Sequence, residues 1–453
     1  MKSTRTPFPA LFVLLLGASA AACGGSSKPG DGAGGEQGGA GGDAEAGQGG
    51  GGQAGGAGQG GQPNLGGGGG SGGSMGGAAG VAAPSGWWVL AAGGDFANVS
   101  AINAVQMGLD GTLTPKSQLQ KAALMDVSVP SYITANAAGN IVYGIDEYYG
   151  GFGRAFAISV DQKSGALTYL NEEFSSGPAS VHVVMDTTAK YLFVANFNGK
   201  SVDVFKLQSD GKVGALSDTK PVGNNPHGVF PEPSGKGVFV PCMASNDVYQ
   251  FSFDAGTGKL TKSADPLKLP NTGPRHMAFS KDGTFAYLVQ ENANSVAVLK
   301  VNRNDGTLMD TGAANLMATV PADAKTMLAG NTLKGRAAEG FVHPNGKFLY
   351  TTSRLDTVNG ANTTPTQGYL GWFAIKADGT LAPGNFVKVG NEPRGFNISP
   401  DGTLLVVANQ KQPTNNLMSF ALDATTGQAT LKSLATIMNQ PMMVVVVPAK
   451  NER

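Results

Sequence analysis

Arginine, glutamate and histidine side chains recur at matched places in the second half of the chain. The segment GPRHMAFSKDGTFAYLVQE, residues 273–291, has Arg275 near its start and ends with Glu291, sixteen residues later. His227 also directly follows a proline, and Arg354 ends a similar run. A guanidinium group keeps its charge and can hold a carboxylate or phosphate by two hydrogen bonds, whereas histidine and glutamate can move protons. These residue types together suit the binding of a small anion combined with proton transfer.

A turn that contains one glycine recurs along the chain and marks a repeated unit. The turn glycines are Gly111, Gly165, Gly211, Gly258, Gly306, Gly379 and Gly427, so most units are 46 to 54 residues long and one spans 73. Each unit carries a proline-led apolar run followed by runs rich in Val, Phe, Tyr and Leu. Four short strands in a unit that is repeated seven times are typical of a β-propeller. We therefore predict an all-β fold, a seven-bladed β-propeller in residues 81–453.

The two ends of this region complement each other. The first unit begins at GWWVLAAG without a proline-led run, and the last such run, QPMMVVVVPA, stands near the C-terminus with no strand after it. We predict that the C-terminal strand pairs with the N-terminal blade and closes the ring.

The residue after each leading proline, or its counterpart in the looser copies, opens the innermost strand of a blade. These positions are Ser131, Ala179, His227, Arg275, Ala338, Arg394 and Met442. The positions sixteen residues later are Glu147, Ala195, Met243, Glu291, Arg354 and Gln410. Because the first two strands of a blade are antiparallel, both sets return to one face of the ring. We expect Arg275 and Glu291 to meet, partly exposed, at the mouth of the central channel, with His227 and Arg354 supplied by the adjacent blades.

Long connections are predicted on this same face. The unit of 73 residues hides an insertion around 309–335, and EYYGGFGR (147–154) and LDTVNGANTTPTQ (355–367) form long loops between second and third strands. Elaborated loops on one face of a regular scaffold mark its binding face. The alternative is structural, since charged residues at strand starts can form salt bridges between blades and a histidine beside proline can simply be packed.

The N-terminal 80 residues have the composition of a leader and a tether. A basic start precedes an apolar run from Leu11 to Ala22, which predicts an export signal over residues 1–22. Of residues 24–80, 30 of 57 are glycine, a composition that cannot form a packed core. We predict lipidation at Cys23, a disordered linker over residues 23–80 and a cell-envelope lipoprotein. Cleavage at an A-x-A site, which would give a freely secreted protein, is the alternative.

The charge balance and the motifs exclude several classes of partner. Lys plus Arg and Asp plus Glu number 32 each, so the chain has no basic field for a nucleic-acid backbone. The histidines at 182, 227, 276 and 343 lack zinc-ligand spacing, and no GxSxG motif is present. We therefore expect no metal, no cofactor and a monomer. A calcium ion held by Asp146, Glu147 or Glu339 is the alternative.

Several segments resemble successive signatures of the seven-bladed lactonase family, which includes bacterial 6-phosphogluconolactonases of propeller type and fungal carboxy-cis,cis-muconate lactonising enzymes. The segments are PHGVF with PEPSGKGVFVP, GPRHMAFSKDGTFAYLVQE, AAEGFVHPNGKFLYTTSR and EPRGFNISPDGTLLVVANQ. The resemblance covers residues 85–449 in the right order. The chain departs from the family pattern at Glu232, where Asp is usual, and at Gln290 and Ser353, where Asn is usual.

The resemblance implies a lactone hydrolase, or a cyclising enzyme, for a small anionic sugar acid or muconate-type compound. It assigns catalysis to His227, Arg275, Glu291 and Arg354. Glu339 and Arg394 match further polar positions of the family, and with Glu147 and Gln410 they are expected to bind substrate. Two neighbouring arginines would lower the pKa of Glu291 and weaken it as a base, which favours His227 in that role.

A non-enzymatic function is the main alternative, because many propellers serve as binding platforms. A tethered propeller would suit the capture of a glycan, a peptide or an envelope protein. A narrow, arginine-rich funnel would favour a small anion, whereas a flat rim with exposed aromatic residues such as Tyr148 and Tyr149 would favour a macromolecule.

Overall fold

The computed structural model describes residues 84–450, except 95–99, 121–123, 125–126, 314, 318–319, 331, 360–361, 412, 415 and 438–439. The predicted export signal, Cys23 and the glycine-rich linker lie outside the described residues. None of the helices in the described part of the chain is long and apolar enough to cross a membrane.

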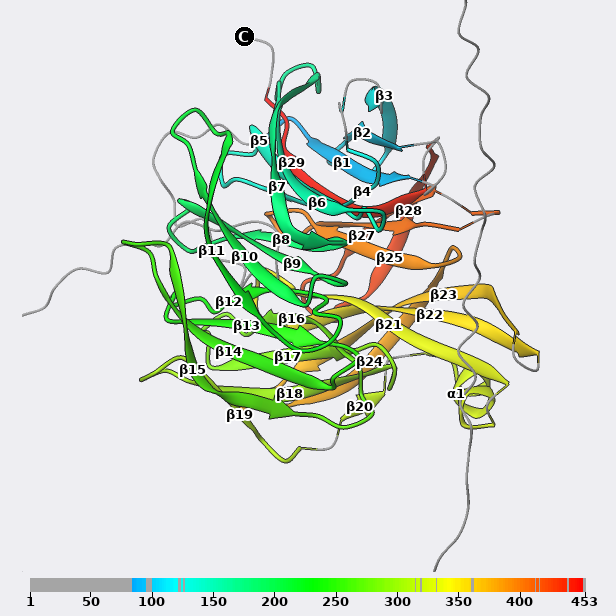
Figure 1. Ribbon diagram of the computed structural model, residues 1–453. Helices are drawn as coiled ribbons and strands as arrows, with labels where there is room; N and C mark the ends of the chain where they lie inside the picture. Colours follow the sequence, from blue (N-terminus) through cyan, green and yellow to red (C-terminus); the bar gives the residue numbers. More distant parts are fainter. Residues whose placement is uncertain are drawn as a thin grey trace, which may run out of the picture. The chain divides into compact units, whose positions relative to one another are not determined.

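Seven antiparallel sheets of four main strands follow one another, and we number them as blades 1 to 7 (Figure 1). Blade 1 contains β29 (Pro441–Pro448), β1 (Trp87–Gly94), β2 (Ser100–Met107) and β3 (Leu113–Gln120). Blade 2 contains β4 (Pro130–Ala135), β5 (Ile141–Asp146), β6 (Phe152–Val160) and β7 (Leu167–Pro178). Blade 3 contains β8 (Ser180–Met185), β9 (Tyr191–Asn196), β10 (Ser201–Leu207) and β11 (Val213–Pro221). Blade 4 contains β12 (Phe230–Pro231), β13 (Gly237–Cys242), β14 (Asp247–Asp254) and β15 (Lys259–Lys268).

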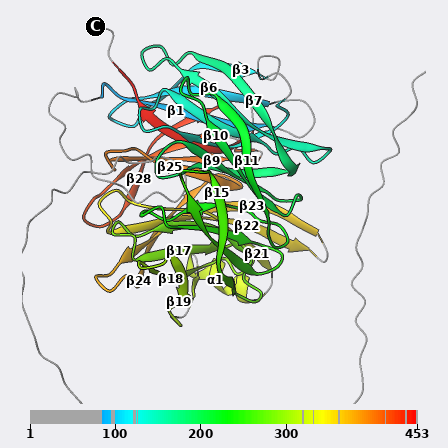
Figure 2. The ribbon, with the colours of Figure 1, turned by 60° about the vertical axis from the view of Figure 1, so that its left-hand side comes forward.

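The last three blades follow the same order, as the continuous change of colour along the chain shows (Figure 2). Blade 5 contains β16 (Pro274–Phe279), β17 (Phe285–Gln290), β18 (Ser295–Asn302) and β19 (Thr307–Asp310), with β20 (Leu316–Met317) added beside β18. Blade 6 contains β21 (Leu333–Val342), β22 (Phe348–Asn359), β23 (Asn362–Ile375) and β24 (Leu381–Val389). Blade 7 contains β25 (Pro393–Ile398), β26 (Leu404–Asn409), β27 (Asn416–Leu422) and β28 (Ala429–Thr436). The predicted seven-bladed β-propeller is confirmed.

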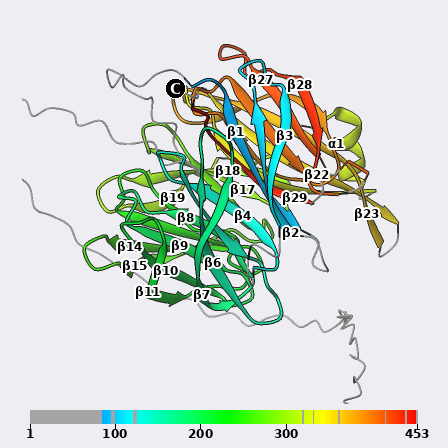
Figure 3. The same cartoon turned by 90° about the horizontal axis from the view of Figure 1, so that it is seen from above.

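The ring closes through blade 1, as predicted. Strand β29 pairs antiparallel with β1, from Trp87 opposite Pro448 to Gly93 opposite Pro441. The red C-terminal strand accordingly lies beside the blue first strand in two views (Figures 1 and 3). The first and last strands of the propeller are therefore hydrogen-bonded parts of one sheet.

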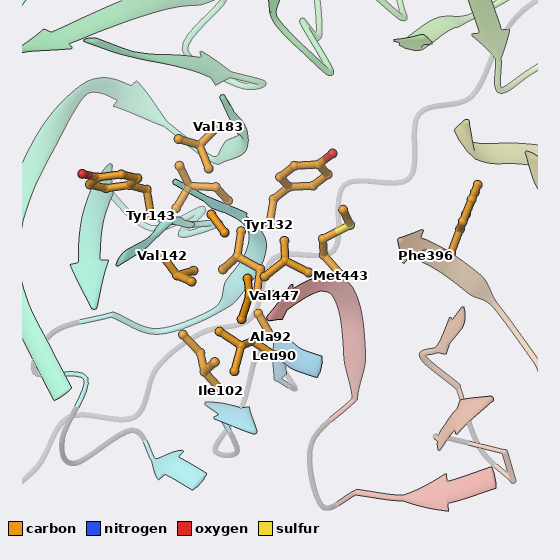
Figure 4. Packing of buried hydrophobic residues seen from close by; sticks show 14 of the residues in the cluster. Leu90, Ala92, Ile102, Tyr132, Val142, Tyr143, Val183, Phe396, Met443 and Val447 are labelled. Carbon is orange, nitrogen blue, oxygen red and sulfur yellow. The ribbon is translucent and has the colours of Figure 1, made fainter. Parts of the chain in front are cut away.

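The strands near the axis are apolar on both faces because each blade is covered by its two neighbours. Every residue of β8 and β9 is buried. The close-up in Figure 4 shows Leu90 and Val447 of blade 1 in the same cluster as Tyr132 and Val142 of blade 2. Contact between adjacent blades therefore forms the core.

The recurrent turn glycine also makes a contact between blades. Gly427 has φ of +74°, a left-handed conformation that suits glycine. A Cβ atom at this position would lie 2.6 Å from Cδ1 of Phe348 in blade 6. The Tyr350 hydroxyl donates a hydrogen bond to the Gly427 carbonyl at 2.7 Å. The repeat therefore needs glycine both for the turn and for close packing on the preceding blade.

The predicted insertion between blades 5 and 6 is present. It contains β20, the helix α1 (Ala322–Ala329) and an N-terminal extension of β21, and α1 packs on β21 through Ala324 and Leu333. The predicted loop over 355–367 is different, because β22 and β23 continue as a paired hairpin up to Asn359 and Asn362. Thr and Val residues in this stretch favour a continued strand ladder.

Candidate functional site

A small hollow lies where the innermost segments of all seven blades converge. The space between its walls, open solvent included, is about 210 Å³. It is lined by Ser131, Tyr132, Val181, His227, Arg275, His276, Glu339, Arg394 and Met442. Five of these, Ser131, His227, Arg275, Arg394 and Met442, hold the aligned positions predicted from the repeat, whereas Val181 and Glu339 take the places expected for Ala179 and Ala338.

Bulges at the starts of the inner strands bring pairs of successive residues to this hollow. The pairing register shifts between Pro130 and Tyr132 in blade 2 and between Pro274 and His276 in blade 5. A bulge places two residues of one strand opposite a single residue of its partner. Consecutive side chains, such as Arg275 and His276, therefore both line the hollow.

Arg275 is anchored at two of its nitrogen atoms. Its Nε donates to Oε2 of Glu291 at 2.9 Å, and its Nη1 donates to the carbonyl oxygen of Ala338 in blade 6. No acceptor among the described residues binds its Nη2. Burial lowers the pKa of Arg275 to about 10, an effect that Glu291 partly offsets, so the group stays charged at neutral pH. The side chain is only 2% exposed, which corrects our expectation of a partly exposed residue.

Glu291 and Arg354 support Arg275 from behind and do not line the hollow. Nη2 of Arg354 lies 3.0 Å from Oε1 of Glu291, and its Nη1 lies 3.3 Å from Oε1 of Glu392. Burial alone would raise the pKa of Glu291, but Arg354, Arg275 and Arg336 outweigh it and lower the pKa to about 2. These ion pairs connect blades 5, 6 and 7. They therefore agree with the alternative of structural salt bridges between blades. They also hold Arg275, which lines the hollow, in place.

Arg336 completes this ion-pair network, and the sequence did not reveal it. Its Nη2 lies 3.0 Å from Oδ2 of Asp356 and 2.9 Å from Oε2 of Glu392. Arg336 lies in the extended start of β21, directly after the predicted insertion, where the repeat offers no aligned position. In the sequence, only the position of Arg336 next to a strand with aligned charged residues could have suggested a role for it.

Three histidine rings pack together around the hollow. The centroid of His276 lies 5.1 Å from that of His182 and 5.2 Å from that of His227. His227 precedes the short strand β12, where its backbone N–H donates to the Pro241 carbonyl at 2.9 Å. Burial, with help from Arg275, holds the pKa of His227 well below its usual value.

His227 therefore remains a neutral imidazole at neutral pH. Its Nδ1 is buried and has no hydrogen-bond partner among the described residues.

Glu339 lies between His276 and Tyr132. Its Oε1 is 2.9 Å from Nδ1 of His276, and the Tyr132 hydroxyl donates to its Oε2 at 3.4 Å. Figure 4 shows the Tyr132 hydroxyl pointing away from the aliphatic residues of blade 1. His276 and Tyr132 were not among the predicted site residues. Their position two places after a leading proline, together with the bulge, is the signal that locates them.

Arg394 crosses toward blade 2 at the edge of the hollow. Its Nη2 lies 2.8 Å from Oε2 of Glu147, whose Oε1 accepts a hydrogen bond from Tyr149 at 2.8 Å. Gln410, also expected to bind substrate, is buried beside Glu392, where its backbone N–H donates to the Glu392 carbonyl at 3.0 Å. Gln410 does not line the hollow.

The residues considered for calcium are engaged otherwise. Asp146 accepts hydrogen bonds from the backbone N–H groups of Ser128 and Val129, at 3.0 and 2.7 Å. Within the described part of the chain, no three His, Cys, Asp or Glu side chains form a group that could hold a metal ion. The hollow instead combines two arginines, two neutral histidines and a buried carboxyl, a set suited to anion binding and proton transfer.

Comparisons with known proteins agree with this picture. Residues 100–446 match the family model described as lactonase, seven-bladed β-propeller. The chain is 26% identical over 356 residues to 6-phosphogluconolactonase of Bacillus subtilis, covering 74% of this chain and 94% of the relative. It is 28% identical over 350 residues to 6-phosphogluconolactonase of Pectobacterium carotovorum, covering 76% and 95%. Among solved structures, the periplasmic gluconolactonase PpgL of Pseudomonas aeruginosa is 25% identical with a TM-score of 0.67, covering 80% of this chain and 99% of PpgL.

Proposed function

Because the chain belongs to the family of seven-bladed β-propeller lactonases, we propose that it opens the lactone ring of a small sugar-acid or muconate-type compound by hydrolysis, or catalyses the reverse cyclisation. One observation carries the proposal. Two arginines, an unpartnered neutral imidazole and a buried carboxyl converge on one hollow at the axis. Relatives that bear the name 6-phosphogluconolactonase support a sugar-acid lactone as substrate.

The arginines bind negative charge in this proposal. Arg275 is held by Glu291 and the Ala338 carbonyl, so its orientation is fixed before substrate arrives. Its Nη2 is directed to the carbonyl oxygen on which negative charge develops during attack. Arg394 binds the carboxylate or phosphate of the substrate after exchanging its contact with Glu147. Preorganised donors of this kind stabilise the transition state more than the ground state.

His227 is the base of the proposed reaction. Its unpartnered Nδ1 takes a proton from the water molecule that attacks the lactone carbonyl. Glu291 is unsuited to this role because Arg354, Arg275 and Arg336 outweigh its burial and lower its pKa to about 2. Glu291 and Arg354 therefore act as positioning residues that hold Arg275.

The proposed site of action is the cell envelope. The leader-like N-terminus, with Cys23 followed by a glycine-rich tract, supports export and lipid anchoring. The likeness to PpgL, described as a periplasmic gluconolactonase, is consistent with this location. An exported enzyme meets lactones outside the cytoplasm, so unphosphorylated sugar-acid lactones belong among the first substrates to test.

A panel of lactones tests the proposed function. The purified protein is assayed at constant pH for acid release from glucono-1,5-lactone, 6-phosphoglucono-1,5-lactone and muconolactone, with the spontaneous rate subtracted. We expect turnover of at least one. His227→Asn should lower kcat by about 10²- to 10⁴-fold, whereas Arg394→Ala should mainly raise KM. The same changes in kcat and KM in both variants would contradict the assigned roles.

Binding of a macromolecule is the second candidate function, and exposed aromatic residues favour it. Tyr148, Tyr149, Phe152 and Phe174 of blade 2 are 40%, 48%, 59% and 61% exposed. Aromatic faces stack on sugar rings and peptide side chains. If no lactone is turned over, a glycan array probed with wild-type protein and with the Tyr148→Ala and Phe152→Ala variants tests this candidate. Equal signals for all three proteins would exclude these aromatic residues from binding.

A further inference from the structure

The carboxyl group of Glu339 has a position that the proposed reaction leaves unused. Glu339 is 2% exposed and lines the hollow, where it faces the same space as His227 and Arg275. Its Oε1 accepts a hydrogen bond from the backbone N–H of Gly340 at 3.0 Å and lies 2.9 Å from Nδ1 of His276. Its backbone N–H donates to Oγ1 of Thr352 at 3.2 Å. Both its backbone and its side chain are therefore held in place.

Charged, titratable or hydrogen-bonding groups from five other elements lie around Glu339. Arg275 and His276 belong to β16, Tyr132 to β4, His182 to β8 and Arg394 to β25, while Thr352 of β22 is neutral. Burial raises the pKa of Glu339 to about 7, although Arg275, the nearest positive charge, lowers it.

His276, which lies beside the carboxyl group of Glu339, carries no positive charge that would favour the carboxylate. Burial and Arg275 hold the pKa of His276 well below its usual value, so its imidazole is neutral. A neutral imidazole nitrogen can accept a hydrogen bond from a protonated carboxyl group. The geometry therefore allows Glu339 to keep a proton within reach of the hollow near neutral pH.

Opening a lactone ring needs such a proton. When the tetrahedral intermediate collapses, the ring oxygen leaves as an alkoxide, which is a poor leaving group unless it is protonated. His227 has by then accepted the proton of the attacking water. A second group is required at the ring oxygen.

We infer that Glu339 is the catalytic acid of the proposed reaction, with His276 and Tyr132 as its positioning residues. This inference rests on the lactone chemistry proposed above. Water forms a bond to the carbonyl carbon and gives one proton to His227, while the carbonyl electron pair moves to its oxygen beside Arg275. The carbonyl then re-forms, the bond from carbon to the ring oxygen breaks, and Glu339 gives its proton to that oxygen.

The cycle is balanced in atoms and charge. One water and one lactone give one hydroxy acid, which ionises to its carboxylate. The proton held by His227 returns to Glu339, directly or by way of solvent, so neither residue is consumed. No oxidant, reductant or metal is needed.

The leaving group of the lactone distinguishes a catalytic acid from a residue with a purely structural role. Glucono-1,5-lactone releases an alkoxide that needs an acid, whereas dihydrocoumarin releases a phenolate, which leaves without one because a phenol has a pKa of about 10. Glu339→Gln should reduce kcat/KM by about 10²- to 10⁴-fold for the sugar lactone but less than about 10-fold for dihydrocoumarin. A structural role predicts equal losses on both substrates.

The pH profile gives a second measurement. Because Glu339 must be protonated to act, kcat/KM of the wild type for the sugar lactone should fall as pH rises through about 7. This limb should be absent in Glu339→Gln. Glu339→Asp, which keeps an acid, should retain the limb and part of the rate, and it also shows whether any loss reflects misfolding. Glu172→Gln, on the outer strand β7 and paired with Arg154 at 3.0 Å, is the matched control and should change neither rate.

The outcomes separate the inference from the proposed function. A wild type that hydrolyses both lactones, with equal losses in Glu339→Gln or an unchanged pH limb, overturns the catalytic acid and leaves the lactonase proposal intact. A wild type that turns over neither these two lactones nor any other lactone of the panel overturns both. Selective loss on the alkoxide substrate, together with loss of the limb, supports both.

Discussion

At the scale of single residues, the pairing of Arg275 with Glu291 follows from a spacing of sixteen residues, which spans one antiparallel turn of the blade. His276 and Tyr132 could not be found in that way. Strict alternation along a strand sends neighbouring residues to opposite faces, and only the bulge turns Arg275 and His276 to the same hollow. A bulge depends on three-dimensional pairing and has no distinct residue pattern here.

Burial was the other property that the residues did not reveal. The side chain of Arg275 is 2% exposed because Glu291 and the Ala338 carbonyl contact its guanidinium group, and Arg354 pairs with Glu291 behind it. The family resemblance gave no distinction between the residues that line the hollow and those that support it.

Acid should destabilise the fold through Glu291. Its folded pKa is about 2, against an ordinary value of 4.5, so its contribution is fully present above pH 4.5 and is lost as pH falls toward 2. The shift corresponds to about 3 kcal/mol at most. We expect the free energy of unfolding, measured by urea titration between pH 6 and 2.5, to fall less steeply in Glu291→Gln than in the wild type. Parallel curves would mean that the ion pairs with Arg275 and Arg354 add no net stability.

At the scale of elements, the repeat predicted the blades because each turn glycine and each proline-led strand has the same local packing in every blade. The insertion was located from the length of one unit, but α1 and the extended β22–β23 hairpin were not predicted. Both form through contacts with β21 and with each other, which a repeat of the other blades cannot specify.

The turn glycines offer a test of packing between blades. Gly427 and Gly312 share a left-handed φ, +74° and +68°, but a Cβ at Gly427 would meet Phe348 at 2.6 Å whereas nothing lies within 4 Å of one at Gly312. Replacement by alanine should cost about 1–2 kcal/mol at either position through φ. Gly427→Ala should cost a further ~1–3 kcal/mol through overpacking. Equal melting temperatures of the two variants would mean that blade 6 yields freely at this contact.

At the scale of the whole molecule, the predicted lipid anchor at Cys23 can be tested by cell fractionation. If Cys23 carries a lipid, Cys23→Ala should move the protein from the membrane fraction to the soluble fraction of cells. The propeller itself should keep its melting temperature, because the substitution lies outside the residues that build the blades. Continued sedimentation of Cys23→Ala with membranes would contradict the lipid anchor.

We expect the propeller to fold only when β29 closes the ring. The six residues from Met442 to Val447 are buried, and the five from Met443 to Val447 contribute to the clusters of blades 1, 2 and 7. Burying an apolar side chain of this size stabilises a protein by about 1.5–3 kcal/mol, so their sum is on the order of 10 kcal/mol. That figure equals the entire stability of many domains, about 5–15 kcal/mol.

Removal of residues 440–453 should therefore abolish cooperative melting of the monomer. It would also leave the edge of β1 unpaired, and an open strand edge invites aggregation. A synthetic peptide of residues 440–453, added during refolding, should restore a cooperative melt by pairing with β1, whereas a peptide of scrambled sequence should not. Calorimetry and size-exclusion chromatography measure both outcomes. A truncated monomer that melts cooperatively near the temperature of the full chain would show that contacts within each blade suffice and that closure by β29 is dispensable.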